Sequence, residues 1–296
     1  IDAAQQLAVT LIRADSMLND TDSLQDIWAQ PLPPYPLGSH TVTMELRDEA
    51  ARFNINNLYH DGTVDVAALG VFQRLLTQLN LDPQIAITAL DWQDGDREVY
   101  QDGGEEGVVY AQQGVGLSAA LPNQPFVSVD QLQDLPNMSA EDLATLRPYL
   151  TAVPYYLPIN INTAHPEVLA ALVEDISAQQ MQGLERLQKQ QVIESVDSIW
   201  QQPPLNAVST EQRQLLTPLL AVDSQAFTAL ITATDSANLG AARQRFATVL
   251  ISKIDTSEGN NTDNVAANNN NDGSNKTSAK TVRVVSQRLW AFAPNF

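Results

Sequence analysis

The sequence contains no cysteine, only 16 lysines and arginines, and three histidines among its 296 residues. Without a thiol, the chain cannot use cysteine catalysis, thiolate-bound metals or disulfide bonds. The 35 acidic residues give a formal net charge of −19. Such a surface repels nucleic acid, because phosphate binding needs clustered basic side chains. The charge is compatible with cation binding or with solubility alone.

Long apolar runs and catalytic signatures are also missing. No stretch of 18 apolar residues occurs, so nothing in this sequence has the length and character of a bilayer span. The sequence begins at Ile1 rather than Met, and we expect a processed or truncated product. There is no G-x-S-x-G motif and no Gly-rich phosphate loop. His40, His60 and His165 are scattered, and we interpret them as surface or turn residues. These absences predict no catalytic residues, and our leading interpretation is a protein that is not an enzyme.

The first 48 residues predict one helix and one strand. Apolar residues recur at helical spacing from Ile1 to Leu18, which predicts a helix with one buried stripe. The Pro-rich stretch 31–36 interrupts regular structure. Alternating apolar and polar residues in HTVTMELRD (40–48) then predict a half-buried strand. The helical stripe comprises Ala4, Leu7, Ala8, Leu11, Ile12 and Leu18.

Residues 49–221 are predicted to form a helical block. Apolar residues in 64–80 follow a helical period. Thr163 is expected to cap a helix that carries Pro166 in its first turn. Capping-box spacing occurs twice, at Ser128 with Gln131 and, more loosely, at Ser139 with Asp142.

A weak internal repeat lies within this block. The segment SVDQLQDLPNMSAEDLATLRPYL (128–150) parallels SVDSIWQQPPLNAVSTEQRQLLTPLL (195–220). Each contains a cap, a short helix, a Pro-containing turn, a second cap and a second helix. The repeat predicts two similar small helical units.

Three strands are predicted after the block, at 225–236, 243–253 and 280–292, and we expect them to be antiparallel. Between the last two, residues 255–280 are almost entirely polar, which predicts a mobile loop because there is little to bury; a metal or glycan role for it stays open. The lone strand at 40–48 needs partners, which these strands supply. We therefore expect an α+β fold in which residues 1–48 and 222–296 form one domain and 49–221 are inserted between strands.

An acidic cluster occupies residues 91–106, where seven carboxylates face one arginine, Arg97. Hard oxygen ligands of this kind suit Ca²⁺. The spacing from Asp94 approaches that of an EF-hand, but Val99 stands where that motif needs glycine, and no flanking helix pair is evident. The residues themselves leave two interpretations, an irregular calcium loop or a solvated acidic loop.

Asparagine-rich stretches carry the resemblance to a known family. Three stretches follow one another along the chain: ARFNINNL (51–58), LDW with DGD (90–96) and ININTAHPEVLAAL (159–172). Together they resemble the K-type minor pseudopilin (GspK) family of the bacterial type II secretion system. The resemblance implies a pilin-like domain, formed by an N-terminal helix and an antiparallel sheet, with an all-α domain inserted between strands. We interpret the asparagines as structural, because Asn side chains satisfy backbone groups where a chain turns into a helix.

The resemblance also implies a function. Family members sit at the tip of the periplasmic pseudopilus with I- and J-type minor pseudopilins, anchored in the inner membrane by an N-terminal helix absent from this sequence. The inserted domain would face the secretin or the cargo protein. The resemblance further implies structural calcium in the Asp-Trp-x-Asp and Gly-x-Glu region. The expected metal ligands are Asp91, Asp94, Asp96, Glu105 and Glu106.

Two other functions stay open on the residues alone. One is a calcium-dependent periplasmic binding module with no part in secretion. The other is a hydrolase that uses paired carboxylates such as Glu105 and Glu106.

Overall fold

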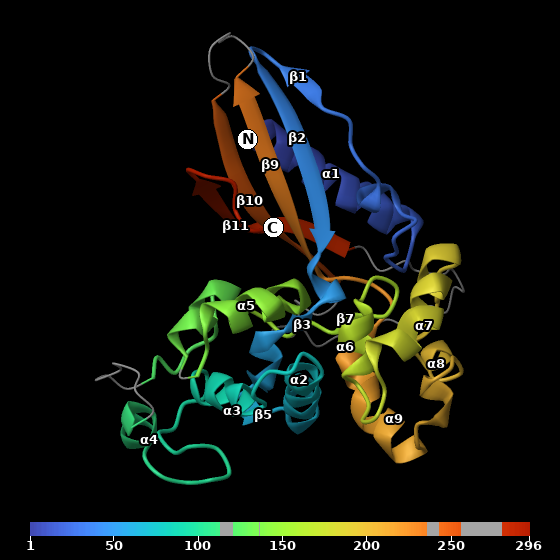
Figure 1. Ribbon diagram of the computed structural model, residues 1–296. Coiled ribbons are helices and arrows are strands. Elements are labelled where there is room, and N and C mark those ends of the chain that lie inside the picture. The colour runs from blue at the N-terminus through green and yellow to red at the C-terminus, as the bar shows by residue number, and fades with distance from the viewer. Residues whose placement is uncertain (113–120, 136, 236–242, 256–279) are drawn as a thin grey trace, which may run out of the picture. The chain divides into compact units, whose positions relative to one another are not determined.

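The chain divides into two compact units. The computed structural model describes residues 1–112, 121–135, 137–235, 243–255 and 280–296 (Figure 1). Residues 1–21, 25–48 and 225–296 form the first unit, and residues 22–24 and 49–224 form the second. In sequence, most of the second unit therefore falls between two parts of the first. The predicted loop at 255–280 lies almost entirely outside the described residues.

The first unit is a five-stranded antiparallel sheet with one long helix, α1 (Asp2–Leu18). The strand order is β1-β2-β9-β10-β11, so two strands from the N-terminal part of the chain lie beside three from the C-terminal part, with β2 paired to β9. The register pairs Met44 of β2 with Ile231 of β9, and Ile231 with Ala247 of β10. The strands are β1 (Tyr35–Leu37), β2 (His40–Asp48), β9 (Ala226–Asp235), β10 (Gln244–Asp255) and β11 (Lys280–Trp290).

Helix α1 packs along this sheet through its small and apolar side chains (Figure 1). Ala4, Ala8 and Ile12 are buried in the same core as Ile231 and Val249. This confirms the helix and most of its predicted stripe, because side chains three and four residues apart share one helix face.

Leu18 departs from the prediction. Its side chain is 81% exposed, because α1 ends at this residue and its buried face ends at Asp15, one turn earlier. Leu7 and Leu11 are only partly buried, at the margin of the core. Within the described residues, the structure contains no helix long and apolar enough to cross a membrane.

The second unit is mainly helical, although it is not all-α as expected. Among its described residues, three pairs of short strands occur, each two residues long. Strands of this length are too short to leave an alternating pattern in the sequence. The helices are α2 (Val66–Gln78), α3 (Gln84–Asp91), α4 (Glu106–Gln112), α5 (Ala140–Leu146), α6 (Pro166–Ala170), α7 (Ala178–Gln190), α8 (Val196–Ile199) and α9 (Thr210–Leu216). The strands are β3 (Phe53–Asn54), β4 (Tyr59–His60), β5 (Thr63–Val64), β6 (Leu150–Thr151), β7 (Ile159–Asn160) and β8 (Leu220–Ala221).

The same arrangement occurs twice in the second unit. Phe53 of β3 pairs in parallel with Leu150 of β6, and Ile159 of β7 pairs in parallel with Leu220 of β8. Each later strand directly follows a Pro-containing turn of 3-10 helix at the end of the repeated segment. The structure thus confirms two similar units, and it extends the repeat to the asparagine stretches, which the sequence comparison had not included.

The asparagines bind backbone groups far away in the sequence. Asn56 Nδ2 donates to the carbonyl of Phe126 at 2.9 Å, and its Oδ1 accepts from the Phe126 amide at 2.8 Å. Asn57 binds Leu157 in the same way, at 2.7 and 2.9 Å. These side chains are buried, so their predicted structural role is confirmed, although these backbone partners are distant in sequence and not nearby as expected.

Helix capping follows the sequence at one site and departs from it at another. Ser139 and Asp142 form the full capping box. The prediction for Thr163 is wrong, because α6 begins at Pro166 and its N-cap is His165. The proline explains this difference, since it disfavours helical backbone at the preceding residue, and His165 is extended with φ −61° and ψ 143°.

Candidate metal centre

The acidic loop follows α3 and returns to α4. The last residue of α3, Asp91, is fully buried. Trp92 then stacks on Phe126 with ring centroids 5.2 Å apart, which fixes where the loop begins. The loop reverses at Gly103 and Gly104, whose φ angles of 66° and 104° favour glycine.

Backbone bonds then bring the two ends of the loop together. The Val99 amide donates to Gly104 at 3.0 Å, and the Glu106 amide donates to Arg97 at 3.0 Å. Closure of the loop places the Glu106 side chain near the carboxylates that follow α3.

Three carboxylates meet inside this loop. One oxygen from each of Asp94, Asp96 and Glu106 lies within 4.8 Å of the other two. Asp94 and Glu106 are 4% and 3% exposed, whereas Asp96 is open to solvent. Asp94 Oδ1 and Glu106 Oε1 are buried atoms without a hydrogen-bond partner in the described part of the chain. Buried acceptors of this kind are costly unless a ligand satisfies them.

The electrostatics of the group favour a cation. Burial, together with the charges of Asp96 and Asp91, raises the pKa of Asp94 to about 7. Burial also raises the pKa of Glu106 to about 7, with Asp91, Asp94 and Asp96 adding to the effect and Arg97 opposing it. A bound cation would stabilise the ionised form of both groups and offset their mutual repulsion.

Asp91 lies behind this group and has hydrogen bonds of its own. Its Oδ1 accepts from the Tyr100 amide at 3.1 Å, and its Oδ2 accepts from the Tyr110 hydroxyl. Burial raises the pKa of Asp91 to about 6, and these two hydrogen bonds oppose the rise. With both oxygens engaged, Asp91 anchors the loop to α4 and contributes negative charge to the site.

The predicted ligands therefore separate into two groups. The fold brings Asp94, Asp96 and Glu106 together. Asp91 lies outside this group, but its charge raises the pKa of Asp94. Glu105 is exposed and lies outside the group, because its backbone pairs with Glu98 across the loop.

Sequence reasoning missed Asn123 as a candidate ligand. Its Nδ2 donates to the carbonyl of Asp96 at 3.1 Å. Its Oδ1 is buried and lacks a hydrogen-bond partner among the described residues. An amide oxygen is a good calcium ligand. Nothing in the sequence around position 123 indicates this role, since only the fold brings it to Asp96.

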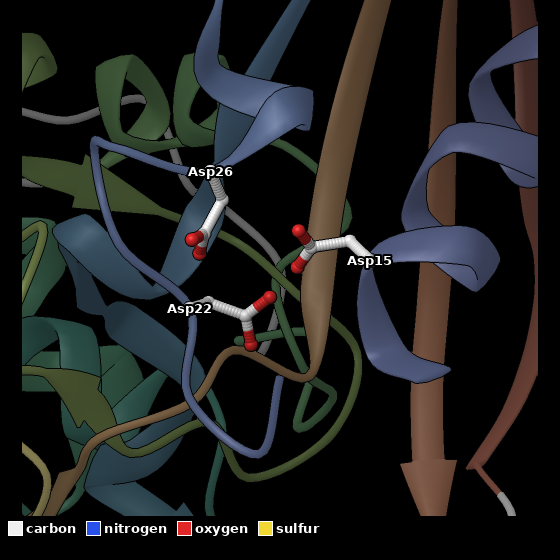
Figure 2. Close-up of side chains that lie close together, drawn as sticks. All are labelled: Asp15, Asp22 and Asp26. Carbon is white, nitrogen blue, oxygen red and sulfur yellow. The ribbon is translucent and has the colours of Figure 1, made fainter. Parts of the chain in front are cut away.

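A second set of acidic side chains lies near the end of α1. Figure 2 shows Asp15 on the helix and Asp22 and Asp26 on the segment that follows. Asn19 Nδ2 donates to Asp15 Oδ1 at 3.2 Å and to Asp26 Oδ1 at 3.4 Å. Asp22 belongs to the second unit, where its Oδ2 accepts from the Ser224 amide at 2.7 Å. We assign these carboxylates structural hydrogen bonds only.

Comparison with protein families finds two matches within the second unit. Two family models, both described as "Type II secretion system (T2SS), protein K", match residues 51–155 and 159–223. Together they cover more than half of the sequence, and the chain belongs to the type II secretion system protein K family. The two matches coincide with the two halves of the second unit that carry the repeated strand pairs.

Three curated relatives, each called type II secretion system protein K, support this assignment. The one from Pseudomonas aeruginosa is 30% identical over 181 residues, which cover 57% of this chain and 54% of the relative. The one from Aeromonas hydrophila is 31% identical over 160 residues, covering 49% and 48%. The one from Pectobacterium carotovorum is 28% identical over 218 residues, covering 68% and 64%. The chain spans about half the length of the first two relatives it matches.

A solved structure shares the fold. It is a chain in the GspK-GspI-GspJ complex from the type 2 secretion system of enterotoxigenic Escherichia coli. The match covers 98% of this chain and 94% of that chain, with a TM-score of 0.74 and 22% sequence identity.

Proposed function

We propose that this chain is a minor pseudopilin that joins I- and J-type minor pseudopilins at the tip of the periplasmic pseudopilus. The observation that carries the proposal is the match to the type II secretion system protein K family over more than half of the chain. The solved neighbour, which covers nearly the whole chain, comes from a GspK-GspI-GspJ complex. The role is structural and involves no catalysis. Glu105 is exposed and Glu106 is buried, so this pair gives no support to a hydrolase.

The architecture is consistent with this role. A long helix on an antiparallel sheet suits a pilin-like domain, and the helical unit is inserted between β2 and β9 in sequence. In a pseudopilus tip, the bulk of that unit would prevent further subunits from adding above it and would meet the secretin or the cargo protein. We also propose that the described region is periplasmic and that an N-terminal helix anchors the protein in the inner membrane, as the family resemblance implies.

Helix α1 offers the face for the partner subunits. Leu7 and Leu11 lie partly buried against the sheet, so the outward face is formed by exposed residues such as Ala3, Thr10 and Met17. This face follows the helical period and lies opposite the buried stripe. It is the face on which partner helices would pack.

Assembly is tested by mixing the chain with cognate I- and J-type pseudopilins and measuring the complex by size-exclusion chromatography with light scattering. We expect a 1:1:1 complex that Thr10→Arg disrupts. Thr145→Arg is the matched control. Thr145 is an exposed helical threonine of the second unit, and its hydroxyl donates to the carbonyl four residues earlier, as that of Thr10 does. Failure of the unaltered chain to co-elute with both partners would refute the proposal.

We further propose that Asp94, Asp96 and Glu106 hold a structural calcium ion, with Asn123 Oδ1 as a neutral ligand. Support comes from the buried oxygens of Asp94, Glu106 and Asn123 that have no hydrogen-bond partner in the described chain. When bound, the ion would neutralise the loop and fix α3 relative to α4. No Lewis-acid step is assigned to it.

Calorimetric titration of the EGTA-treated, desalted chain with Ca²⁺ tests the site. We expect saturable binding that Asp94→Asn abolishes and that the exposed-site control Asp134→Asn leaves unchanged. Mg²⁺ should bind much more weakly, because it requires a tight octahedron and retains its waters. Equal heats of Ca²⁺ binding for the unaltered chain and for Asp94→Asn would refute the calcium proposal. The assembly proposal would not be affected.

A further inference from the structure

A hollow of about 690 Å³ opens on the second unit, away from the acidic loop. It lies between the C-terminal turn of α2 and the segment that connects α6 with α7. Its volume is within the range of 300–1,000 Å³ that is typical of ligand pockets. All of its lining residues belong to the second unit.

The floor of the hollow is apolar. Leu79, Val173 and Ile176 line it, and each is partly buried against the core of the second unit. Two neighbouring polar side chains donate hydrogen bonds within the protein, although the buried Gln78 Oε1 has no hydrogen-bond partner among the described residues. Gln78 Nε2 donates to the carbonyl of Ile176 at 3.2 Å, and Thr77 Oγ1 donates to the carbonyl of Gln73 at 2.9 Å. A ligand in the hollow would therefore contact hydrocarbon on the floor.

The one cationic side chain of the lining is also engaged. Arg74 Nε donates to the carbonyl of Ala171 at 2.7 Å, and its Nη2 donates to the carbonyl of Leu172 at 2.9 Å. Burial lowers the pKa of Arg74, and the charge of Glu174 opposes that shift. The guanidinium thus holds the end of α6 in place and is poorly placed to receive an anionic ligand.

Carboxylates dominate the rim. Glu167, Glu174 and Asp175 line the hollow, and neither Glu174 nor Asp175 makes an ion pair within the part of the chain that the structure describes. Opposing them are Arg74 and the N-terminus of α7, which carries roughly half a positive charge. Three negative charges therefore outweigh about one and a half positive ones.

The surrounding field has the same sign. Of all charged residues, 24 acidic and only 7 basic ones fall in the second unit. Such a field raises the local concentration of cationic ligands.

We propose that this hollow binds a lysine or arginine side chain from a basic peptide segment of a partner protein. The aliphatic stem of the side chain lies on the floor formed by Leu79, Val173 and Ile176, and its charged end reaches Glu174 and Asp175. Lys and Arg have the required form, a hydrocarbon stem with a terminal cation. The hollow is too large and its floor too apolar for a bare ion. This inference goes beyond the assembly role and is independent of the calcium site.

NMR titration of the ¹⁵N-labelled full chain tests the proposal, with the blocked tripeptide acetyl-Leu-Lys-Leu-amide as the probe. All samples contain EGTA and no partner subunits, so the result does not depend on calcium or on assembly. We expect saturable shifts of the Val173, Ile176 and Ala178 amides, weakened by 0.5 M salt because exposed charges are screened. The acidic probe acetyl-Leu-Glu-Leu-amide should produce no such shifts. Equal shifts from both peptides, or none from the basic one, would overturn the proposal.

Substitutions in the lining test whether the basic tripeptide binds in the hollow. Glu174→Gln with Asp175→Asn should weaken binding about three- to tenfold, the effect of losing two exposed ion pairs. Asparagine suits position 175, where φ is 60°. The matched control is Glu194→Gln with Asp197→Asn, an exposed acidic pair outside the hollow. Ala178→Leu partly fills the hollow without changing its charge and should weaken binding.

A free amine separates peptide recognition from simple amine capture. Butylammonium has a cation on an aliphatic stem but no flanking residues, and it should bind at least about tenfold more weakly than the tripeptide. Comparable affinity for the two probes, or an unchanged affinity in the Glu174→Gln/Asp175→Asn variant, would contradict the assignment to a peptide segment.

Discussion

Asn162 forms a two-point clamp on Ile193. Its Oδ1 accepts from the Ile193 amide at 2.7 Å, and its Nδ2 donates to the Ile193 carbonyl at 3.0 Å. The same amide group donates to the carbonyl of Val222 at 3.2 Å. Asn56 clamps Phe126 in the same way in the first half of the second unit. In both halves the clamped residue lies two positions before a serine that caps the following helix, so one buried side chain sets where each repeated segment begins.

Replacing Asn162 by alanine should destabilise the second unit by about 2–4 kcal/mol. The substitution leaves the polar backbone atoms of Ile193 buried without a partner, and each such loss costs about 1–3 kcal/mol. Chemical denaturation followed by circular dichroism measures the change. The control is Asn206→Ala at an exposed position, which should remain within about 0.5 kcal/mol of the unaltered chain. Equal destabilisation by both variants would show that the hydrogen bonds of Asn162 add nothing to the free energy of unfolding beyond what an exposed asparagine adds.

The sequence was most informative where structure depends on near neighbours. The Ser139 capping box was predicted from a three-residue spacing and formed as predicted. At Ser128 the predicted partner, Gln131, accepts instead from the Val127 amide, and the Ser128 side chain accepts from the Asp130 amide. The reason is that a 3-10 helix follows at Val129–Asp134, and its tighter winding shifts the cap by one residue.

Contacts between distant segments could not be predicted in this way. The partners of the asparagines lie dozens of residues away, and a single sequence contains no record of which carbonyl a buried amide will reach. The candidate metal centre illustrates the same limit. Asp94 and Asp96 are neighbours in sequence, and the acidic cluster together with the family resemblance suggested them. The separation of buried Glu106 from exposed Glu105, and the approach of Asn123, depend on how the loop closes.

The two halves of the repeat differ in their second helix caps, and the difference should be measurable. Ser139 and Asp142 form a reciprocal capping box, whereas Ser209 Oγ accepts from the Gln212 amide and no capping box is formed there. Asp142→Ala removes the acceptor of the Ser139 amide and should cost about 1 kcal/mol, whereas Gln212→Ala removes no such bond and should stay within about 0.5 kcal/mol of the unaltered chain. Urea denaturation of the two variants provides the comparison. Equal losses would show that the bond from the Ser139 amide to Asp142 contributes nothing.

Tyr110→Phe should destabilise the calcium-free protein more at pH 8 than at pH 5. The Tyr110 hydroxyl donates to Asp91 Oδ2, and burial raises the pKa of Asp91 to about 6. Above that pH the carboxylate is ionised and needs the donor, whereas the protonated acid depends on it less. We expect a loss of about 1–3 kcal/mol at pH 8, measured by chemical denaturation in EGTA.

Tyr100→Phe serves as the control for Tyr110→Phe, because the bond from Tyr100 to Asp91 comes from its backbone amide and survives the substitution. A Tyr110→Phe effect that is independent of pH would contradict the role assigned to this hydroxyl.

The stability of the calcium-free protein should fall as the pH rises from 5 to 7.5. The pKa values of Asp94 and Glu106 rise from ordinary values of 3.8 and 4.5 to about 7 on folding. Between those limits the folded protein therefore binds more protons than the unfolded chain, and the free energy of unfolding decreases with increasing pH. Solvent screening at this partly open site limits the change to about 1–3 kcal/mol. Calcium should remove the decrease, because the ion favours the ionised carboxylates and binds only the folded form, adding about 2.7 kcal/mol at a hundredfold excess over Kd. Thermal unfolding at each pH, in EGTA and in millimolar Ca²⁺, measures both the decrease with pH and its removal by calcium. Asp94→Asn should make the decrease in EGTA smaller without removing it, because Glu106 still titrates, and should abolish the response to calcium. Parallel profiles with and without calcium in the unaltered chain would show the group to be a solvated acidic surface.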